Sequence, residues 1–427
     1  MAYNYPEQYY PFNNCRIHLF KHGENTYSKV SYPVRTGIYS EVETNDFTYH
    51  FNLNDEIIRI IGKTSEWPHP HEWLKRTAGN DWIYYSTGGY TGVFETTGEY
   101  YLPNLPYSTN NALGGTPFNN RHIRSATRHW YQNLKSLQVT LHSAGKEVSR
   151  FLGSAMNKTP EYLTKKAQDF TFCHGGPISV LPPDTRHVDY NVIPLSLSEG
   201  CLYKCHFCKV KNNKPFSVKS DSQILEQITQ LQQLYADDLF NYNSLFIGEH
   251  DGLNGGPQKL IFTISEALNK LKLDNSWWCG SNIFLFGSVF SLLNTPSALF
   301  EDLATMIPNI YINVGLESAD QETLDRLGKP LTSQMIVEAF DLIQDINGRY
   351  QNIEITSNFV TDDTLNTNHY QMLISLIRDR VSKPKSKGCI YLSPLQFGSP
   401  SRAQLFKFYR LKVQSRLPLF LYTIQKL

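Results

Sequence analysis

The chain has 427 residues and a formal net charge of +1, so its overall charge points neither to nucleic acid nor to an anionic membrane. No stretch approaches the roughly 18 apolar residues of a membrane-spanning helix, and the first residues carry no basic-then-apolar signal. Seven cysteines, three of them close together, indicate metal ligation in a reducing cytoplasm and not a disulfide scaffold.

Residues 1–175 are predicted to form a smaller, aromatic-rich α+β domain whose role the sequence does not define. Short β-like runs such as 47–51 and 82–85 lie among segments rich in Tyr, Asn, Gly and Pro. Residues 121–155 repeat apolar side chains at three- or four-residue steps, which predicts helix. The many aromatic residues of 67–107 would suit either a substrate pocket or an aromatic core.

Residues 190–395 alternate short apolar runs with amphipathic helical segments. Six runs are predicted to be strands, namely 193–197, 244–247, 283–286, 310–314, 353–356 and 390–392. Strands that alternate with helices form a parallel sheet with right-handed crossovers. The predicted fold class is therefore α/β, an incomplete parallel (β/α)6 TIM-like barrel beside the α+β domain. Residues 396–427 are predicted to add a helix and a strand that close one side of the barrel.

Cys201, Cys205 and Cys208 form a C-x3-C-x2-C loop directly after the first predicted strand. Thiolates are the soft ligands that zinc and iron–sulfur clusters select. Zinc usually takes a fourth protein ligand, which His206 or His174 could supply. A cluster held by three cysteines instead leaves one iron open to bind another molecule. The loop therefore predicts either a structural zinc site or an iron–sulfur centre with an open position.

Polar residues also follow the other predicted strands. The candidates, in chain order, are Gly248, Glu249, Asp251, Glu317, Ser318 and Asn358. Because the carboxyl ends of parallel strands meet at one edge of a sheet, these residues are expected to lie beside the cysteine loop. A carboxylate there can bind an ammonium group or contact a diol. The alternative is that these carboxylates only cap loops or a helix.

The cysteine loop, with Phe207 just before its last cysteine, resembles the radical S-adenosylmethionine (SAM) superfamily. A second element is residues 313–330, Asn-Val-Gly-Leu-Glu-Ser-Ala-Asp-Gln-Glu-Thr-Leu-Asp-Arg-Leu-Gly-Lys-Pro, similar to the branch of tRNA methylthiotransferases and oxygen-independent coproporphyrinogen oxidases. A third is Gly248-Glu249, similar to the family's Gly-Gly-Glu, although Ile247 replaces the first glycine. The resemblance covers roughly residues 190–395.

The resemblance implies an enzyme. Cys201, Cys205 and Cys208 would hold a [4Fe–4S] cluster, and SAM would bind its open iron. Reductive cleavage of SAM would give a 5′-deoxyadenosyl radical that takes hydrogen from a substrate. The implied SAM-binding residues are Phe207 beside the adenine, Glu249 or Asp251 near the ammonium, Glu317 or Ser318 near the ribose, with Gly248 and Asn358 in the same set.

The resemblance also implies flavodoxin or ferredoxin as the reductant. Neutral charge and the aromatic first domain favour a small-molecule or peptide substrate over nucleic acid, in a cytoplasmic enzyme without membrane contact. The final reaction stays open. Two other functions also stay open, a tRNA-modifying radical SAM enzyme and a non-catalytic protein with a structural zinc.

Overall fold

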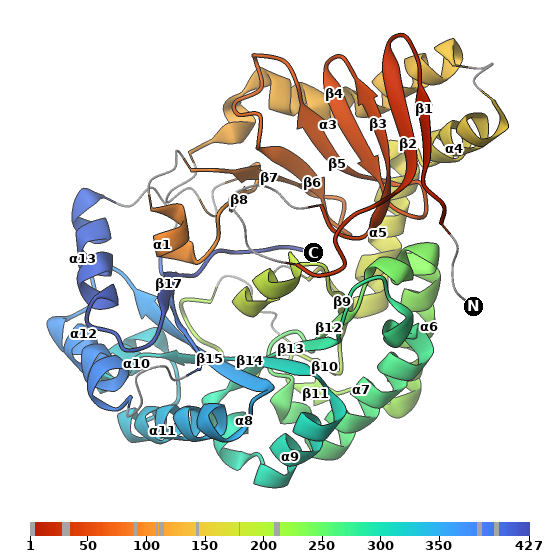
Figure 1. Cartoon of the computed structure of the whole chain (residues 1–427). Coiled ribbons are helices and arrows are strands. Elements are labelled where there is room, and N and C mark those ends of the chain that lie inside the picture. Colours follow the sequence, from red (N-terminus) through yellow and green to blue (C-terminus); the bar gives the residue numbers. More distant parts are fainter. Residues whose placement is uncertain are drawn as a thin grey trace.

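The computed structural model describes residues 5–27, 35–88, 92–107, 110, 115–141, 145–178, 180–208, 214–381, 387–396 and 401–427. Two large sheets organise the molecule, one antiparallel and one parallel, as Figure 1 shows. Helices cover the outer side of each sheet. No helix in these ranges is long and apolar enough to cross a membrane.

The antiparallel sheet has eight strands that lie side by side in chain order. They are β1 (Gln8–Pro11), β2 (Cys15–His22), β3 (Ile38–Thr44), β4 (Phe47–Phe51), β5 (Ile57–Gly62), β6 (Trp73–Arg76), β7 (Trp82–Ser86) and β8 (Leu102–Asn104). Side chains alternate between the two faces of a strand. One face is apolar, including Val42, Tyr49 and Ile60, and packs under helices α3 (Arg121–Thr140) and α4 (Lys146–Asn157).

Helices follow this sheet in the chain. They are α1 (Val93–Thr97), α3 (Arg121–Thr140), α4 (Lys146–Asn157) and α5 (Pro160–His174). The helix predicted over 121–155 is thus two helices, separated before Gly145. Helix α5 was not predicted, although its signals are in the sequence. Thr159 caps its start by accepting from the Tyr162 amide, Pro160 takes the first helical position, and Gly175 ends it at φ 78°.

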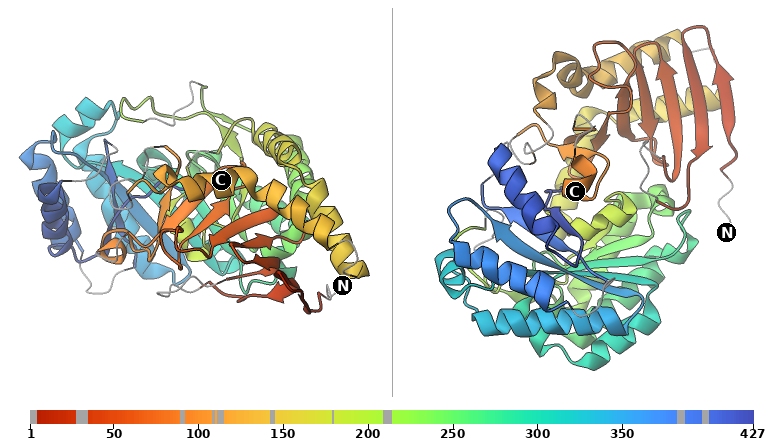
Figure 2. Two further views of the ribbon diagram at one scale, coloured as in Figure 1. Left: turned by 90° about the horizontal axis from the view of Figure 1, so that it is seen from above. Right: turned by 60° about the vertical axis from the view of Figure 1, so that its left-hand side comes forward.

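The parallel sheet has seven strands in the order β17-β16-β15-β14-β13-β12-β9. They are β9 (Ile193–Leu195), β12 (Ser244–Ile247), β13 (Asn282–Ser288), β14 (Asn309–Glu317), β15 (Ile353–Thr361), β16 (Ile390–Pro394) and β17 (Leu419–Leu421). Each strand lies next to its predecessor, so every crossover runs in one direction and places its helices on one face. Figures 1 and 2 show these helices around the outside.

Those helices are α6 (Asp221–Tyr235), α7 (Pro257–Leu271), α8 (Val289–Asn294), α9 (Ser297–Met306), α10 (Gln321–Leu327), α11 (Ser333–Arg349), α12 (Thr367–Ile374) and α13 (Arg402–Lys412). Their apolar faces and the outer face of the sheet form the largest core of the molecule. Amphipathic helices that bury one stripe against a parallel sheet are what the alternating sequence pattern predicts.

The predicted α/β class with a parallel sheet is confirmed, and all six predicted strands are present. The seventh strand, β17, comes from the predicted C-terminal helix–strand segment and pairs with β16. The edge strands β9 and β17 do not pair with each other within the described residues, so the sheet is open. Strands β13, β14 and β15 continue past their apolar segments into polar residues. Their C-terminal ends therefore lie later in the chain than predicted.

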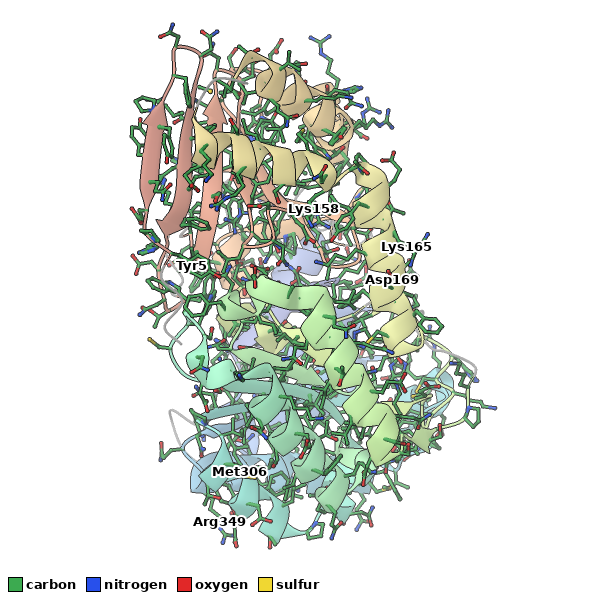
Figure 3. The ribbon with its side chains drawn as sticks, turned by 90° about the vertical axis from the view of Figure 1, so that its right-hand side faces the viewer. Tyr5, Lys158, Lys165, Asp169, Met306 and Arg349 are labelled. Carbon is green, nitrogen blue, oxygen red and sulfur yellow. The ribbon has the colours of Figure 1, made fainter. Side chains whose placement is uncertain are left out.

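The inner face of the parallel sheet is covered by the antiparallel sheet and by residues 178 and 180–192. Phe246 and Phe284 of the parallel sheet share one apolar cluster with Trp73 and Tyr85 of the antiparallel sheet. Helix α5, which carries the Lys165 and Asp169 labelled in Figure 3, runs from one sheet layer to the other and packs on α6. The two sheets therefore enclose a shared interior.

Candidate active site

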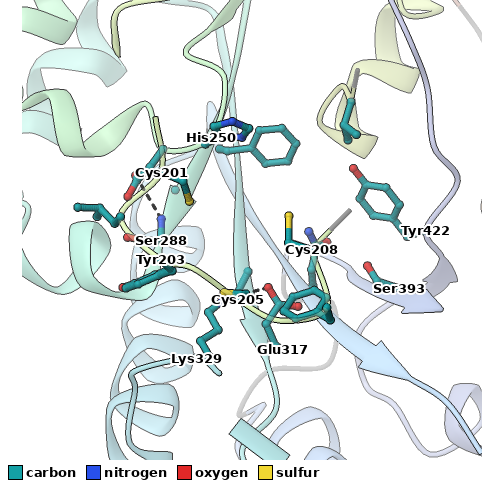
Figure 4. A pocket seen from close by; sticks show the side chains of 18 of the residues that line it. Cys201, Tyr203, Cys205, Cys208, His250, Ser288, Glu317, Lys329, Ser393 and Tyr422 are labelled. Carbon is teal, nitrogen blue, oxygen red and sulfur yellow. Dashed lines mark hydrogen bonds and ion pairs between the residues drawn. The ribbon is translucent and has the colours of Figure 1, made fainter. Parts of the chain in front are cut away.

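A cavity of about 300 Å³ lies at the carboxyl ends of the parallel strands (Figure 4). Most of the predicted site residues line it, namely Cys201, Cys205, Phe207, Cys208, Glu249, Asp251, Glu317 and Asn358. Gly248 and Ser318 do not line it. The loops after β9, β12, β14 and β15 thus meet at one place, because parallel strands end at the same edge of the sheet.

The cysteine loop is held at both its base and its tip. At the base, the two-residue strands β10 (Ser198–Glu199) and β11 (Ser217–Val218) pair antiparallel. Gly200 adopts φ 78° there, and a Cβ would lie 2.2 Å from the Pro215 carbonyl oxygen, so only glycine fits. Near the tip, the His206 amide donates to the Leu327 carbonyl at 2.8 Å at the end of α10. The loop is therefore a fixed element of the site.

The three cysteines surround the cavity without converging on one point. Burial raises the pKa of the Cys205 thiol to about 11 and also raises that of Cys201, an effect that a bound metal centre would reverse. Among the described residues, no three Cys, His, Asp or Glu side chains are close enough to hold a single ion. All ligands of a zinc ion lie about 2.0–2.3 Å from the same atom, so they must converge on one point. Each cysteine of a [4Fe–4S] cluster instead binds a different iron, so the cysteines can lie further apart.

The histidines considered as a fourth zinc ligand lie outside the cavity. The exposed His206 ring packs on Gly328, where a Cβ would lie 2.9 Å from it. His174 is buried against Phe170 at the end of α5. Neither histidine therefore adds a fourth ligand to the three thiols, and the other potential ligands among the described residues that line the cavity do not gather with the thiols around one point. This arrangement fits a three-cysteine cluster with one open iron better than a four-ligand zinc site.

Asp251 lines the cavity, and one of its buried carboxylate oxygens has no protein partner. Its Oδ1 accepts from the Ser288 amide, the Ser291 hydroxyl and the Asn254 amide at 3.3, 2.8 and 3.3 Å. Its Oδ2 has no hydrogen-bond partner, although the residue is only 3% exposed. Burial raises the pKa of this carboxyl. An oxygen held in this way is suited to a cationic ligand, because an unmet buried acceptor is costly.

Glu317 forms a buried ion pair with Lys329. The Lys329 ammonium donates to Glu317 Oε1 at 2.8 Å and to the Gly315 carbonyl at 2.7 Å. Burial opposes the charge on Lys329, but the Glu317 carboxylate outweighs it and raises the pKa of this ammonium. Glu317 has φ 66°, beside an irregularity in the pairing of β14 with β15. A Cβ at Gly315 would lie 2.5 Å from Glu317 Oε1, so glycine makes room for the pair.

Glu317 does not cap a helix, which was the alternative to ligand binding. The N-cap of α10 is Asp320, whose carboxylate accepts from the Thr323 amide at 3.0 Å. Ser318 points away from the cavity. Its hydroxyl contacts the buried His369 ring at 2.8 Å and accepts from the Asp320 amide. We therefore leave Ser318 out of the proposed SAM-binding set.

Glu249 and Gly248 occupy the turn after β12 in different ways. Glu249 is partly exposed, and its carboxylate lies 3.6 Å from the His250 ring. Gly248 adopts φ 85° and donates its amide to the Leu195 carbonyl, which joins this turn to β9. Its role is backbone geometry, because a Cβ would lie 3.0 Å from the Gly252 Cα.

The chain after β17 supplies a wall of the cavity that the sequence did not reveal. Tyr422 and Ile424 line the cavity opposite the cysteine loop, together with Val180. The Tyr422 hydroxyl donates to the Leu181 carbonyl at 3.1 Å. Asn110 holds Ile424 from both sides, accepting from its amide at 2.9 Å and donating to its carbonyl at 2.8 Å. Residues from both ends of the chain therefore build this wall.

Comparison with known proteins gives one family match. The family model of the radical SAM superfamily matches residues 195–377. No curated protein matches the chain significantly in sequence. Among solved structures, the cobalamin-dependent S-adenosylmethionine radical enzyme OxsB aligns at 17% identity and TM-score 0.33, over 44% of this chain and 26% of its own.

Two further solved structures align at similar levels. A radical SAM methyltransferase from Sphaerobacter thermophilus has 13% identity and TM-score 0.36, over 54% of this chain and 65% of its own. Methylornithine synthase (PylB) has 11% identity and TM-score 0.34, over 62% of this chain and 78% of its own.

Proposed function

Residues 195–377 belong to the radical SAM superfamily, and from this membership we propose that the chain is an enzyme that abstracts hydrogen from a small-molecule or peptide substrate. Members of the superfamily use a [4Fe–4S] cluster and SAM. When bound and reduced, this pair supplies a 5′-deoxyadenosyl radical. The observation that carries the proposal is the arrangement of three thiols and one unpartnered carboxylate oxygen around a single cavity.

We assign Cys201, Cys205 and Cys208 to the cluster. The fixed base and tip of their loop support this assignment, because a cluster needs its three thiolates held at fixed positions relative to one another. The raised pKa values of the Cys201 and Cys205 thiols mean that binding the cluster must release protons from these two residues. The open iron would then be the position at which SAM binds.

We assign Asp251 to the SAM ammonium group, in preference to Glu249. Asp251 lines the cavity, is buried and is fixed by three donors, and its Oδ2 has no protein partner, whereas Glu249 is partly exposed. A preorganised carboxylate binds an ammonium group more strongly than a mobile, solvated one.

Glu317 is assigned to the ribose hydroxyls. Lys329 orients the Glu317 carboxylate through its hydrogen bond to Oε1, which makes Lys329 a positioning residue. Phe207 and Asn358 line the same cavity and complete the proposed SAM-binding set. Phe207 is assigned to the adenine, and Asn358 lies near the end of its strand.

The lining of the cavity supports a small-molecule or peptide substrate. Among the described residues that line the cavity, Lys329 is the only Lys or Arg, and it is paired with Glu317. A nucleic-acid site would instead need free cations for the phosphates. Opposite the cysteine loop the wall is mostly apolar, including Phe286, Leu395 and Ile424, which helps to keep water from a reactive radical.

The proposal is tested by anaerobic reconstitution with iron and sulfide, followed by reduction and SAM. Flavodoxin or ferredoxin is the proposed physiological reductant, and dithionite replaces it in the assay. We expect an iron-containing protein that forms 5′-deoxyadenosine, detected by mass spectrometry. Cys201→Ala, Cys205→Ala and Cys208→Ala should each lose iron and this product.

Cys279→Ala is the matched control, because Cys279 is exposed and does not line the cavity. It should keep both iron and product formation. Full iron content in all three cavity variants, or a zinc protein without nucleoside product, would contradict the proposed function.

A further inference from the structure

The inner face of the antiparallel sheet carries a row of ionisable side chains although it is covered by the other sheet. Glu41, His50, Arg59 and Lys75 lie directly opposite one another on β3, β4, β5 and β6. The opposite face of the same strands is apolar. Buried ionisable groups need partners, so the partners of each member decide what the row does.

The two ends of the row are satisfied by protein groups. At one end, the His50 ring hydrogen-bonds to Glu41 Oε2 at 3.0 Å and accepts from Arg59 Nη1 at 3.3 Å. Burial lowers the pKa of His50 to about 3, which agrees with a neutral ring in this relay. At the other end, Lys75 donates to the Asp189 carbonyl at 2.7 Å and to Asn191 Oδ1 at 2.9 Å.

Three N–H groups near the middle of the row have no acceptor. They are Arg59 Nε, Arg35 Nη1 and Trp73 Nε1, and all three atoms are buried. Arg59 and Trp73 are 6% and 5% exposed. The Arg35 guanidinium stacks over the Trp73 ring at 4.9 Å, and Trp73 lies on β6, on the same face as Lys75. The unmet groups are thus all donors and belong to one cluster.

The cluster also has an excess of positive charge. Within the described residues, neither Arg35 nor Arg59 forms an ion pair, and the nearby Asp189 carboxylate is paired with Lys75 at 3.7 Å. Burial, together with the charge on Arg59, lowers the pKa of Arg35 to about 9. Water could accept from the three donors, but it would not compensate the charge of two buried guanidinium groups.

We propose that Arg35, Arg59 and Trp73 form a binding site for an oxyanion, the carboxylate or phosphate group of a small molecule. An oxyanion offers several acceptor lone pairs and a negative charge at once, and guanidinium groups are the side chains best matched to it. Arg35 is partly exposed, so the site is reached from its side. The proposal does not depend on the SAM chemistry of the cysteine cavity.

The test uses the full chain with sodium phosphate and sodium benzoate as separate probes, each compared with sodium chloride at equal ionic strength. We expect saturable binding of at least one probe by calorimetry, a matching rise in Tm, and no such effect of chloride. A response to phosphate alone assigns the site to phosphate compounds, and a response to benzoate alone assigns it to carboxylates. Trp73→Phe removes one donor and keeps an aromatic ring, so it should weaken binding roughly tenfold.

Arg35→Gln and Arg59→Gln should each weaken binding by at least roughly tenfold, because each removes a charge as well as a donor. Arg16→Gln is the control, since Arg16 is an arginine of the same sheet that pairs with Glu43 at the surface. If Arg59→Gln does not fold, the binding measured for Trp73→Phe and Arg35→Gln decides whether the proposed site exists. Binding of neither probe, or equal binding by all variants, would refute the proposed oxyanion site. The three buried N–H groups would then donate to water. Formation of 5′-deoxyadenosine is measured separately and does not enter the result.

Discussion

Asp251→Asn is the sharpest test of the proposed SAM site. Asparagine keeps an oxygen in place of Oδ1, which accepts from Ser288, Ser291 and Asn254. Its amide nitrogen replaces Oδ2, which has no protein partner. The substitution therefore removes the negative charge with little change in packing. We expect the free energy of unfolding to change by less than about 1 kcal/mol.

The expected loss of SAM affinity follows from the lost contact. A hydrogen bond to a charged group contributes about 1.5–3 kcal/mol, so the Kd for SAM should rise roughly 10- to 100-fold. Calorimetry on the reconstituted, unreduced protein measures this Kd directly. Iron content is measured in the same samples and should equal that of the unmodified protein, because Asp251 is not assigned to the cluster.

Glu249→Gln is the matched control, since it also neutralises one carboxylate of the same turn. We expect it to change the Kd for SAM by less than about threefold, because the Glu249 carboxylate is partly exposed. If Glu249→Gln weakens SAM binding while Asp251→Asn does not, the roles of the two carboxylates are reversed. Unchanged affinity in both variants would refute the argument from the unpartnered oxygen.

Lys329→Met should lower the free energy of unfolding by about 3–5 kcal/mol, because it leaves the Glu317 carboxylate buried without a counter-charge. Urea unfolding measures this loss. Recovery of stability on adding Glu317→Gln would identify the unpaired charge as the cause. Asn110→Ala should raise the amide hydrogen-exchange rates of residues 422–426 at least roughly tenfold, because both hydrogen bonds to Ile424 are lost. Unchanged exchange rates would show that packing alone holds this segment. Stability should fall as the pH drops from about 6.5 towards 4, because burial holds three histidine pKa values below the unfolded value and these rings must charge on unfolding. Each ring contributes about 1.4 kcal/mol per pH unit within that window. Urea unfolding at pH 7.5 and 5.5 checks this, and equal stability would contradict it. The rings and their pKa values are His50 at about 3, His174 at about 3 and His369 at about 4.

The parallel sheet and the cysteine loop were predictable because their signals are local. A strand followed by closely spaced thiols can be read without knowing what lies beside it. The partners that fix each side chain were not predictable in the same way. Asp251 is oriented by Ser288 at the end of the next strand and by Ser291 in helix α8, and Lys329 reaches Glu317 only because helix α10 lies between them. Both pairings depend on tertiary geometry.

The antiparallel sheet shows a different limit of sequence reading. Polar and apolar residues alternate along β3 to β6, which is typical of a sheet with one face in water. The polar face is instead covered by residues 178 and 180–192 and the parallel sheet, as Lys75 and its contacts to Asp189 and Asn191 show. Composition alone gave no sign that this face is buried.

The return of the chain after β17 has a consequence for biosynthesis. This segment contacts the antiparallel sheet region through Lys426 and Asp81, and the interior through the Leu181 amide and the Gln425 carbonyl. A ribosome releases these residues some 200 positions after the cysteine loop. The cavity therefore stays without one wall while most of the chain is already folded. Any group that enters between the thiols during translation has an open path to them until residues 419–427 arrive to close it.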